Sequence, residues 1–345
     1  MITKFFANGY RCLKNVELSL TPLHAVIGPN DSGKSTILRG IEAAVGFATH
    51  EPFAFDDPGD PAAQPWLQLS TSDGDPAEVG FAVVGFRYDV RRLPTGFVAE
   101  RVSVGNDVKQ FERPVYEKSL VKRSLGKQAP SFVPRTVRLL PTLMRAESPL
   151  VTEAQLLEMP RRGGEHLAGV LQALQGRGDE AYNRVRDAML EKFHTLKSIG
   201  VAATSPSKLE LRAQLRDGTK VAAANLSEGF LYYLAFNVLR EIATSSIFLI
   251  EEPENGLHPS RVRDVIAILR SITEAGCQIV LATHSPLVIN ELRPEEVTVV
   301  ARPSTELGTL VTPIKKTPLF GARGHDMPLG DLWLRHADAD ARTDV

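Results

Sequence analysis

The sequence contains only two cysteines, Cys12 and Cys277, in 345 residues. Two cysteines are too few for a disulfide framework or for a cysteine-based zinc site. Both lie in apolar, strand-like surroundings, so we expect them to be small buried side chains. A protein of this kind is expected in a reducing compartment, and we place it in the cytoplasm.

Long hydrophobic runs and a leader sequence are also missing. No apolar stretch approaches the roughly 18 residues that a membrane-spanning helix requires. The first ten residues, MITKFFANGY, lack the charged and then apolar plan of a signal peptide. The sequence therefore predicts no association with a membrane.

Charge of one sign is not in excess, because 40 Lys and Arg face 41 Asp and Glu. The whole chain therefore shows no global attraction to nucleic acid or to an anionic membrane. Hydrophobic residues make up 43% and charged residues 23%, a globular balance that argues against long disordered regions. The sequence also lacks an internal repeat and a sustained heptad pattern, so a long coiled-coil arm is not expected.

What is present is an alternation of short apolar strands and helices. Strands are predicted at 23–27, 247–250 and 278–282, and helices at about 35–45, 228–242 and 260–274. This alternation implies a parallel sheet that is covered on both faces. The predicted fold class is α/β with a split core, formed by residues 1–50 and 226–312 and followed by a C-terminal tail, 313–345.

Residues 51–225 form an insertion between the two halves of this core. Residues 51–78 are rich in Pro, Asp, Gly and Ala, which predicts a long loop. A β-like pattern follows from Val79 to about Val115, and a helical region covers about 150–198. Leu209–Val221 is predicted to be a hairpin that turns at Asp217-Gly218. The insertion is thus expected to be mixed, β and helical.

The strongest motif is the segment 28–35, Gly-Pro-Asn-Asp-Ser-Gly-Lys-Ser. It fits the P-loop pattern G-x-x-x-x-G-K-[ST] without a mismatch, and it lies between a predicted strand and a predicted helix. Backbone N–H groups and the helix N-terminus would bind phosphate, Lys34 would lie between the β- and γ-phosphates, and Ser35 would bind Mg²⁺. The predicted ATP-binding residues are Gly28, Asn30, Asp31, Ser32, Gly33, Lys34, Ser35 and Thr36.

A second motif, Ile247-Phe-Leu-Ile-Glu251-Glu252, is a buried strand that ends in two acids. The pattern is weak by itself, because acids are common at strand ends, but it gains weight beside a P-loop. One carboxylate at this position can bind the metal, and its neighbour can orient the attacking water. We assign Glu251 to the metal and Glu252 to the water.

His284 follows the predicted strand at 278–282. The tips of parallel strands are where ligands bind in open α/β sheets, so His284 could hydrogen-bond a γ-phosphate or the attacking water. The alternative is an exposed loop histidine, which is the expectation for the other seven histidines. The position favours the functional role, and the predicted catalytic residues are Lys34, Glu252 and His284.

The segment 226–230, Leu-Ser-Glu-Gly-Phe, opens the predicted helix 228–242, and alone it indicates only a serine N-cap. The four motifs in this order resemble those of the ABC-class ATPases: Walker A, LSxG signature, Walker B and switch histidine. Within that class, IEEPENGLHP followed by ATHSP is similar to the RecF/OLD-like AAA ATPases of bacterial phage-defence and toxin–antitoxin systems. Weaker similarity covers the opening strand, LMRAESPL and LGDLWL.

The resemblance implies an ATP-dependent homodimer in which two subunits stack head to tail around two ATP molecules. Ser227 and the N–H of Gly229 would then contact the γ-phosphate held by the P-loop of the other subunit. Asn255 and His258 would belong to the D-loop, through which each site senses the other. Arg11 is placed either near the nucleotide or on the plain surface.

Three departures from the family pattern qualify the resemblance. The Walker B aspartate is replaced by Glu251, which still offers an oxygen ligand. The signature is LSEGF rather than LSGGQ, which argues against a transporter subunit. The Q-loop glutamine cannot be placed from the sequence.

Residues 109–145 contain nine Lys or Arg and only two acids. This excess is either an electrostatic footprint for a phosphate backbone or a set of surface charges that acids elsewhere balance. The candidate contacts to DNA or RNA are Lys118, Lys122, Arg123 and Lys127.

The first hypothesis is an Mg²⁺-dependent ATPase, gated by ATP and linked to nucleic acid, in phage defence or DNA repair. The alternative is a scaffold whose slow ATPase times assembly with a separate effector protein, a nuclease or a toxin. A nuclease acting alone is disfavoured, because the OLD nuclease domain follows the ATPase and only about 60 residues follow His284 here.

Overall fold

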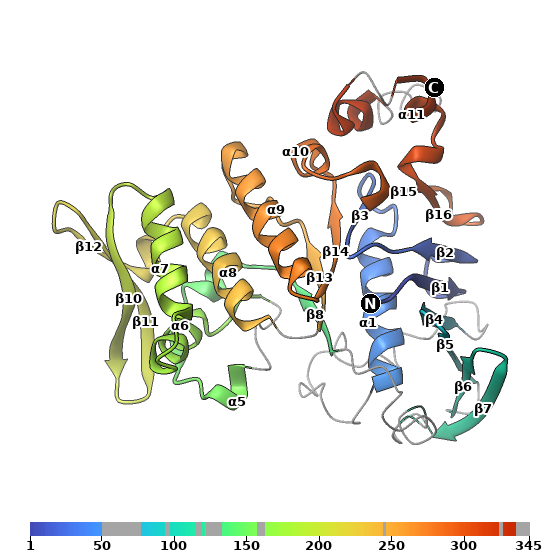
Figure 1. Cartoon of the computed structure of the whole chain (residues 1–345), viewed down its shortest axis with the longest axis horizontal. Helices are drawn as coiled ribbons and strands as arrows, with labels where there is room; N and C mark the ends of the chain where they lie inside the picture. The colour runs from blue at the N-terminus through green and yellow to red at the C-terminus, as the bar shows by residue number, and fades with distance from the viewer. Residues whose placement is uncertain are drawn as a thin grey trace. The chain divides into compact units, whose positions relative to one another are not determined.

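The computed structural model describes residues 1–49, 77–93, 97–114, 119, 121, 133–156, 163–243, 246–323 and 327–335 (Figure 1). The chain divides into two compact units. The first comprises Met1–Pro134, Ser245–Leu249 and Gln278–Val345, and the second comprises Arg135–Thr244 and Ile250–Cys277. The predicted division into a split core and an insertion does not coincide with these two units. The limits of the core and of the insertion stay a prediction.

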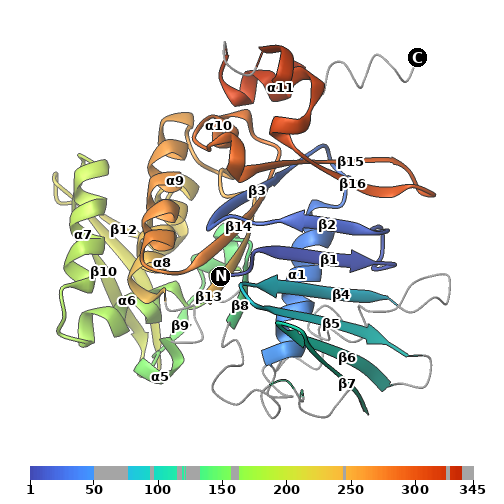
Figure 2. The ribbon, with the colours of Figure 1, turned by 45° about the vertical axis from the view of Figure 1, so that its right-hand side comes forward.

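The first unit contains an antiparallel sheet with the strand order β2-β1-β4-β5-β6-β7 (Figure 2). Val79 and Phe81 in β4 and Tyr88 and Val90 in β5 are buried at every second position, so one face of the sheet packs inward. The β-like pattern predicted from Val79 onward is confirmed. The strands are β1 (Lys4–Asn8), β2 (Val16–Ser19), β4 (Glu78–Val83), β5 (Phe86–Arg92), β6 (Phe97–Val104) and β7 (Asp107–Pro114).

A second sheet has the strand order β16-β15-β3-β14-β13-β8. Its strands are β3 (Leu23–Ile27), β8 (Val133–Val137), β13 (Ser246–Glu251), β14 (Gln278–Thr283), β15 (Val297–Ser304) and β16 (Gly308–Pro313). β3 is parallel to both β14 and β15, whereas β16 is antiparallel to β15. Every residue of β3 and β14 is buried, as expected for central strands covered on both faces. β8 and β13 each begin in the first unit and end in the second.

Helix α1 (Lys34–Thr49) packs against strands of both sheets of the first unit, and Figure 2 shows it behind the antiparallel sheet. Its apolar residues, among them Ile37 and Ile41, share one hydrophobic core with Phe5 and Val280. The helix comes so close to β1 that a Cβ added to Gly40 would lie 2.6 Å from the Phe5 ring. The remaining elements of this unit are α10 (Pro286–Asn290), η4 (Pro294–Glu296), η5 (Ile314–Lys316) and α11 (Pro318–Arg323).

The second unit combines helices with a small antiparallel sheet of order β10-β11-β12, in which β9 also pairs with β11. Its strands are β9 (Ser148–Pro149), β10 (Leu196–Ser205), β11 (Lys208–Leu215) and β12 (Lys220–Ala222). Its helices are α4 (Pro141–Met144), α5 (Glu153–Leu156), α6 (Leu167–Gly176), α7 (Ala181–Lys192), η3 (Ala223–Asn225), α8 (Glu228–Ile242) and α9 (Pro259–Glu274).

The predicted hairpin of this sheet is confirmed, since Gly218 has a φ of 92° in the turn between β11 and β12. The helical region predicted to reach residue 198 was too long. α7 ends at Lys192, and β10 begins at Leu196 and pairs along β11. The segment LKSIGVAATS has a weak apolar alternation, so its strand identity depends on pairing with β11.

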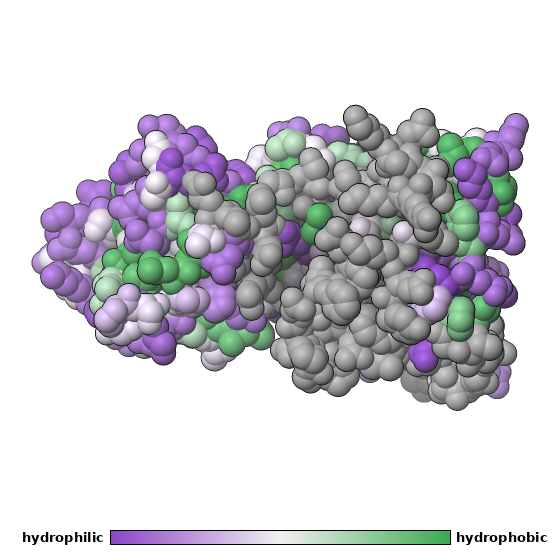
Figure 3. Space-filling model, turned by 90° about the horizontal axis from the view of Figure 1, so that it is seen from below, coloured by the Kyte–Doolittle hydropathy of each residue, from purple (hydrophilic) through white to green (hydrophobic). Residues whose placement is uncertain are grey.

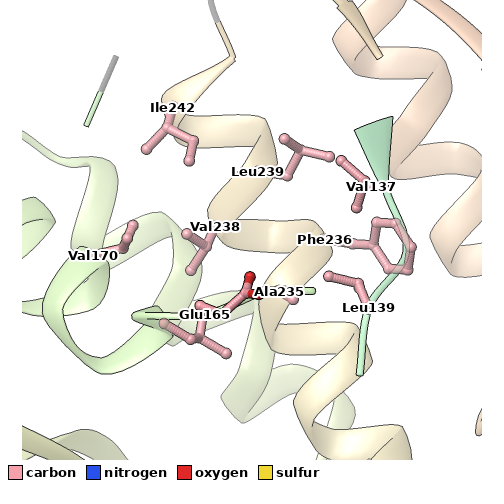
Figure 4. Close-up of a pocket in the computed structure, with 11 residues that line it drawn as sticks. Val137, Leu139, Glu165, Val170, Ala235, Phe236, Val238, Leu239 and Ile242 are labelled. Carbon is pink, nitrogen blue, oxygen red and sulfur yellow. The ribbon is translucent and has the colours of Figure 1, made fainter. Parts of the chain in front are cut away.

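A small apolar pocket lies between α6, α8 and the segment after β8 (Figure 4). Its volume is about 20 Å³, which is room for about one water molecule, and Glu165 is the charged residue in its lining. The pocket is too small for a nucleotide. On the face drawn in Figure 3, hydrophilic residues predominate on the surface of the second unit. Within the described part of the chain, no helix has the length and apolar composition to cross a membrane.

Candidate nucleotide-binding site

The predicted P-loop follows the end of β3 and leads directly into α1. Asp31 and Gly33 have φ values of 61° and 106°, so the chain turns through the left-handed region twice within the loop. The Lys34 side chain folds back over the loop, and its Nζ donates to the carbonyls of Gly28 and Pro29 at 2.8 Å each. The ammonium group therefore lies within the loop, where a phosphate is expected to bind.

A residue that sequence reasoning missed, Thr309, makes hydrogen bonds that support the P-loop. Thr309, on β16, is 1% exposed and donates its hydroxyl hydrogen to the Ser32 carbonyl at 3.0 Å. Its backbone N–H donates to the Cys12 carbonyl at 2.8 Å. No motif marks Thr309, because the contact joins positions 277 residues apart. Cys277 is buried as expected, whereas Cys12 is only half-buried beside this contact.

The two glycines of the motif are required by this close support. A Cβ added to Gly28 would lie 2.2 Å from the Val300 carbonyl oxygen. One added to Gly33 would lie 2.4 Å from the Thr309 hydroxyl, and the φ of Gly33 also favours glycine. The loop is thus a tight backbone cradle that no larger residue could form.

The register of the parallel sheet brings His284 to the same edge as the P-loop. Thr283, the last residue of β14, pairs with Ile27, the last residue of β3. His284 and Gly28 are therefore the next residues of two neighbouring strands, and His284 is exposed. This placement agrees with the expectation for a strand-tip histidine, and its catalytic role stays a prediction.

The two predicted Walker B acids lie in the second unit, at the end of β13. Glu251 is 7% exposed, and its Oε1 is buried and has no hydrogen-bond partner among the described residues. A buried carboxylate with an unsatisfied oxygen fits a hard divalent cation such as Mg²⁺. Glu252 has a φ of 47°, a strained conformation of the kind that collects at functional sites. The division of roles between the two acids stays a prediction.

The signature segment opens α8 as the sequence predicted. Ser227 is the N-cap, and its Oγ accepts a hydrogen bond from the Phe230 N–H at 3.3 Å. Sequence reasoning missed Arg145, whose guanidinium donates to the Leu226 carbonyl through Nη2 at 2.9 Å and Nε at 3.3 Å. The signature is therefore held on both sides of its serine.

The predicted D-loop lies against the first turn of α8 within the second unit. Gly256 has a φ of 68°, and a Cβ added there would lie 2.7 Å from the Tyr232 ring. A Cβ added to Gly229 would in turn lie 3.2 Å from the Gly256 carbonyl oxygen. His258 is the N-cap of α9, and its Nδ1 accepts from the Ser260 N–H at 3.3 Å. The structure thus brings together the signature and the D-loop, two motifs that the sequence separates.

Several basic residues of the stretch 109–145 have partners within the protein, which its composition did not indicate. Arg113 is 3% exposed, and its Nη2 lies 2.8 Å from Oε1 of the buried Glu100. The Tyr88 hydroxyl donates to the same oxygen at 2.7 Å, and burial raises the pKa of Tyr88 well above its usual range. Arg113 is therefore not a surface contact.

Three further members of the basic stretch also have partners. Lys109 lies 3.8 Å from Asp107, Arg138 pairs with Glu251, and Arg145 binds the Leu226 carbonyl. The four candidate nucleic-acid contacts lie outside the described residues: Lys118, Lys122, Arg123 and Lys127.

The P-loop between β3 and α1 and the parallel pairing of β3 with β14 and β15 define the class of this fold, an α/β P-loop fold of the ABC-ATPase type. A family model described as "AAA ATPase domain" matches residues 1–52. A second, described as "AAA domain, putative AbiEii toxin, Type IV TA system", matches residues 164–290. The two matches cover the P-loop and the stretch from the signature to His284.

A curated relative narrows the resemblance. An OLD nuclease of Thermus scotoductus (strain ATCC 700910 / SA-01) is 25% identical over an alignment of 344 residues. The alignment covers 88% of this chain and 62% of the relative. The chain thus spans somewhat less than two thirds of that nuclease. The predicted resemblance to OLD-like ATPases is confirmed.

Solved structures of Smc heads share the fold. An Smc head bound to the C-winged helix domain of ScpA has a TM-score of 0.57 at 14% identity and covers 90% of this chain and 96% of its own. An Smc head domain with an extended coiled coil, bound to the C-terminal domain of ScpA derived from Pyrococcus furiosus, has a TM-score of 0.53 at 12% identity. It covers 91% of this chain and 97% of its own. At these identities the likeness shows the fold alone.

Proposed function

We propose that this chain is an Mg²⁺-dependent ATPase that closes into a head-to-tail homodimer around ATP. The observation that carries the proposal is the P-loop, in which a buried lysine ammonium lies inside a tight backbone cradle. The matches to AAA ATPase models and to an OLD nuclease support it.

Each predicted residue has a defined task in this proposal. Lys34 exchanges the Gly28 and Pro29 carbonyls for the β- and γ-phosphates, and Ser35 and Glu251 are the metal ligands. Bound Mg²⁺ would supply charge neutralisation on the phosphates. Glu252 orients the attacking water, and His284 donates a hydrogen bond to the γ-phosphate or holds that water.

Closure of the dimer would complete the site. The N-terminus of α8 carries a positive partial charge, and Ser227 and the Gly229 N–H lie at this end of the helix. Facing the γ-phosphate of the other subunit, they would add charge stabilisation that exists only in the closed state. The packing of Gly256 against the same helix turn would let the D-loop report closure.

We further propose that the ATPase is linked to nucleic acid in phage defence or DNA repair, and that it works in the cytoplasm. The names of the OLD nuclease relative and of the matched toxin–antitoxin model support this role. The second candidate is a slow-ATPase scaffold that binds an effector protein. The ion pairs of Arg113 and Arg138 with acidic residues favour it, as do the Smc heads that are bound to ScpA domains.

The test of the ATP switch is the Glu252→Gln variant. We expect it to bind ATP, to hydrolyse it at least about a hundredfold more slowly, and to sediment as a dimer only when ATP and Mg²⁺ are present. The Lys34→Ala/Glu252→Gln double variant should remain a monomer, because it cannot hold the nucleotide. Hydrolysis by Glu252→Gln at the wild-type rate would refute the assignment of that residue.

Steady-state ATP hydrolysis with and without single- and double-stranded DNA at low salt separates the two roles. Stimulation that decreases with rising salt supports the nucleic-acid link. A slow rate that DNA does not change supports the scaffold. Reversal of Lys122 and Arg123 to Glu should abolish stimulation in the first case and leave effector assembly intact in the second.

A further inference from the structure

Arg138 is the residue that follows β8, the neighbour of β13 in the sheet. Its Nη1 lies 3.6 Å from Oε2 of Glu251, which is the last residue of β13. The Tyr232 hydroxyl donates to the carbonyl of the adjacent Leu139 at 3.1 Å and so fixes the backbone beside Arg138. The main chain at this point is thus anchored, and the arginine side chain extends from it to the buried acid.

The two partners of this ion pair differ sharply in exposure. The Glu251 side chain is 7% exposed, whereas that of Arg138 is 58% exposed. A buried carboxylate is costly unless a positive charge compensates it, and Arg138 supplies that charge. At 3.6 Å, however, the guanidinium is beyond hydrogen-bonding distance, and the other carboxylate oxygen has no hydrogen-bond partner in the described part of the chain.

Glu251 is therefore neutralised in charge but not saturated in hydrogen bonds. A strong bidentate pair would block a metal ligand, and an absent countercharge would leave a buried anion unstable. The longer contact between Arg138 and Glu251 neither blocks a metal ligand nor leaves the carboxylate without a countercharge. An exposed arginine can turn into solvent at little cost.

We propose that Arg138 is an internal counter-cation that occupies the Glu251 carboxylate until a divalent metal replaces it. Two cations at one carboxylate repel each other, so we expect metal binding to displace the guanidinium. Arg138 is a positioning residue that acts through Glu251 and lowers the affinity for the metal. The inference rests on the proposed function, in which Glu251 is a metal ligand.

The first test is a double-variant cycle on the nucleotide-free protein in EDTA. Arg138→Gln should lower the melting temperature by about 2–4 °C, because Glu251 loses its countercharge. In the Glu251→Gln background the same change should have little effect. Arg216→Gln, which removes an exposed charge from the same unit, is the matched control and should leave the melting temperature unchanged. Equal losses from Arg138→Gln in both backgrounds would overturn the proposal.

The second test measures the metal directly, by electron paramagnetic resonance of Mn²⁺ with a saturating non-hydrolysable ATP analogue. Arg138→Gln should bind Mn²⁺ about 3–10-fold more tightly than wild type, which is about 1 kcal/mol. Arg138→Lys, which keeps the charge, should stay close to wild type. Unchanged or weaker Mn²⁺ binding by Arg138→Gln would overturn the proposal.

The two failures can be told apart. If the wild-type protein binds no fluorescent ATP analogue, the proposed function fails. The proposed competition between Arg138 and the metal for Glu251 then fails with it. If it binds the analogue but the Arg138 variants show no change in Mn²⁺ affinity, the ATPase stands and the counter-cation does not.

Discussion

The hydroxyl of Thr309 donates a hydrogen bond to the backbone carbonyl of Ser32, and this contact ties β16 to the P-loop. Both residues are almost completely buried. Ser32 belongs to the most recognisable motif of the sequence, whereas Thr309 belongs to a strand that no motif marks. The shape of the phosphate cradle thus depends on a strand near the other end of the printed sequence.

Thr309→Val should weaken nucleotide binding. The valine keeps the shape of threonine but leaves the Ser32 carbonyl without its donor, at a cost of about 1–3 kcal/mol. If about half of that cost falls on the bound loop, the Kd for a fluorescent ATP analogue should rise about two- to thirteenfold. Thr309→Ser should restore binding, and Thr312→Val on the same strand is the control. An unchanged Kd for Thr309→Val would show that the loop keeps its shape without this contact.

Ser227→Asp should separate the cap of α8 from the closure of the dimer. Aspartate is as good an N-cap as serine, so the melting temperature should stay close to that of wild type. Its negative charge would face the γ-phosphate of the other subunit, so the variant should no longer dimerise with ATP in sedimentation experiments. Ser227→Ala should instead lose about 1 kcal/mol of stability. Normal dimerisation of Ser227→Asp would mean that this helix end does not meet the phosphate.

Arg113→Leu should destabilise the first unit rather than affect nucleic acid. The substitution leaves the Glu100 carboxylate, which is 1% exposed, without its positive partner, at a cost of about 3–5 kcal/mol in urea unfolding. Adding Glu100→Gln should recover part of that loss. Arg101→Leu, on an exposed position of β6, is the matched control. A stable Arg113→Leu with impaired DNA binding would contradict the buried role.

The protein should lose stability between pH 6.5 and 4 because of His24. Burial lowers the pKa of His24 to about 4 from 6.5, and its ring nitrogens lie 3.1 Å from the hydroxyls of Thr21 and Thr298. The unfolded chain therefore binds a proton in this range that the folded chain does not. Lowering the pH from 7.5 to 5 should cost about 2 kcal/mol at this one group.

His24→Gln should remove that part of the pH dependence in urea unfolding at the two pH values. His194→Gln, at an exposed histidine, should leave the pH dependence as it is in wild type. An equal loss of stability at pH 5 in wild type and His24→Gln would show that other groups cause the pH dependence.

Much of the parallel sheet could be predicted from the sequence. The strand predicted at 23–27 agrees with β3 in both bounds, and the helix predicted at 228–242 agrees with α8. These segments succeed because central strands are continuously apolar and helices have a contiguous 3.6-residue pattern. The strand β10 was not predicted because the alternation of apolar residues in it is weak, and its strand identity comes from pairing with β11.

The sequence by itself determined the P-loop, the paired acids and the serine cap, because each is a contiguous pattern with its own local geometry. The tertiary structure alone decided that β1 and β2 join the sheet of β4 to β7, that Thr309 supports Ser32, and that Arg138 faces Glu251. It also turned Arg113 inward, where composition had indicated surface charge. The physical reason is that strand pairing and ion pairing join residues that are distant along the chain, and no local pattern records which of them meet.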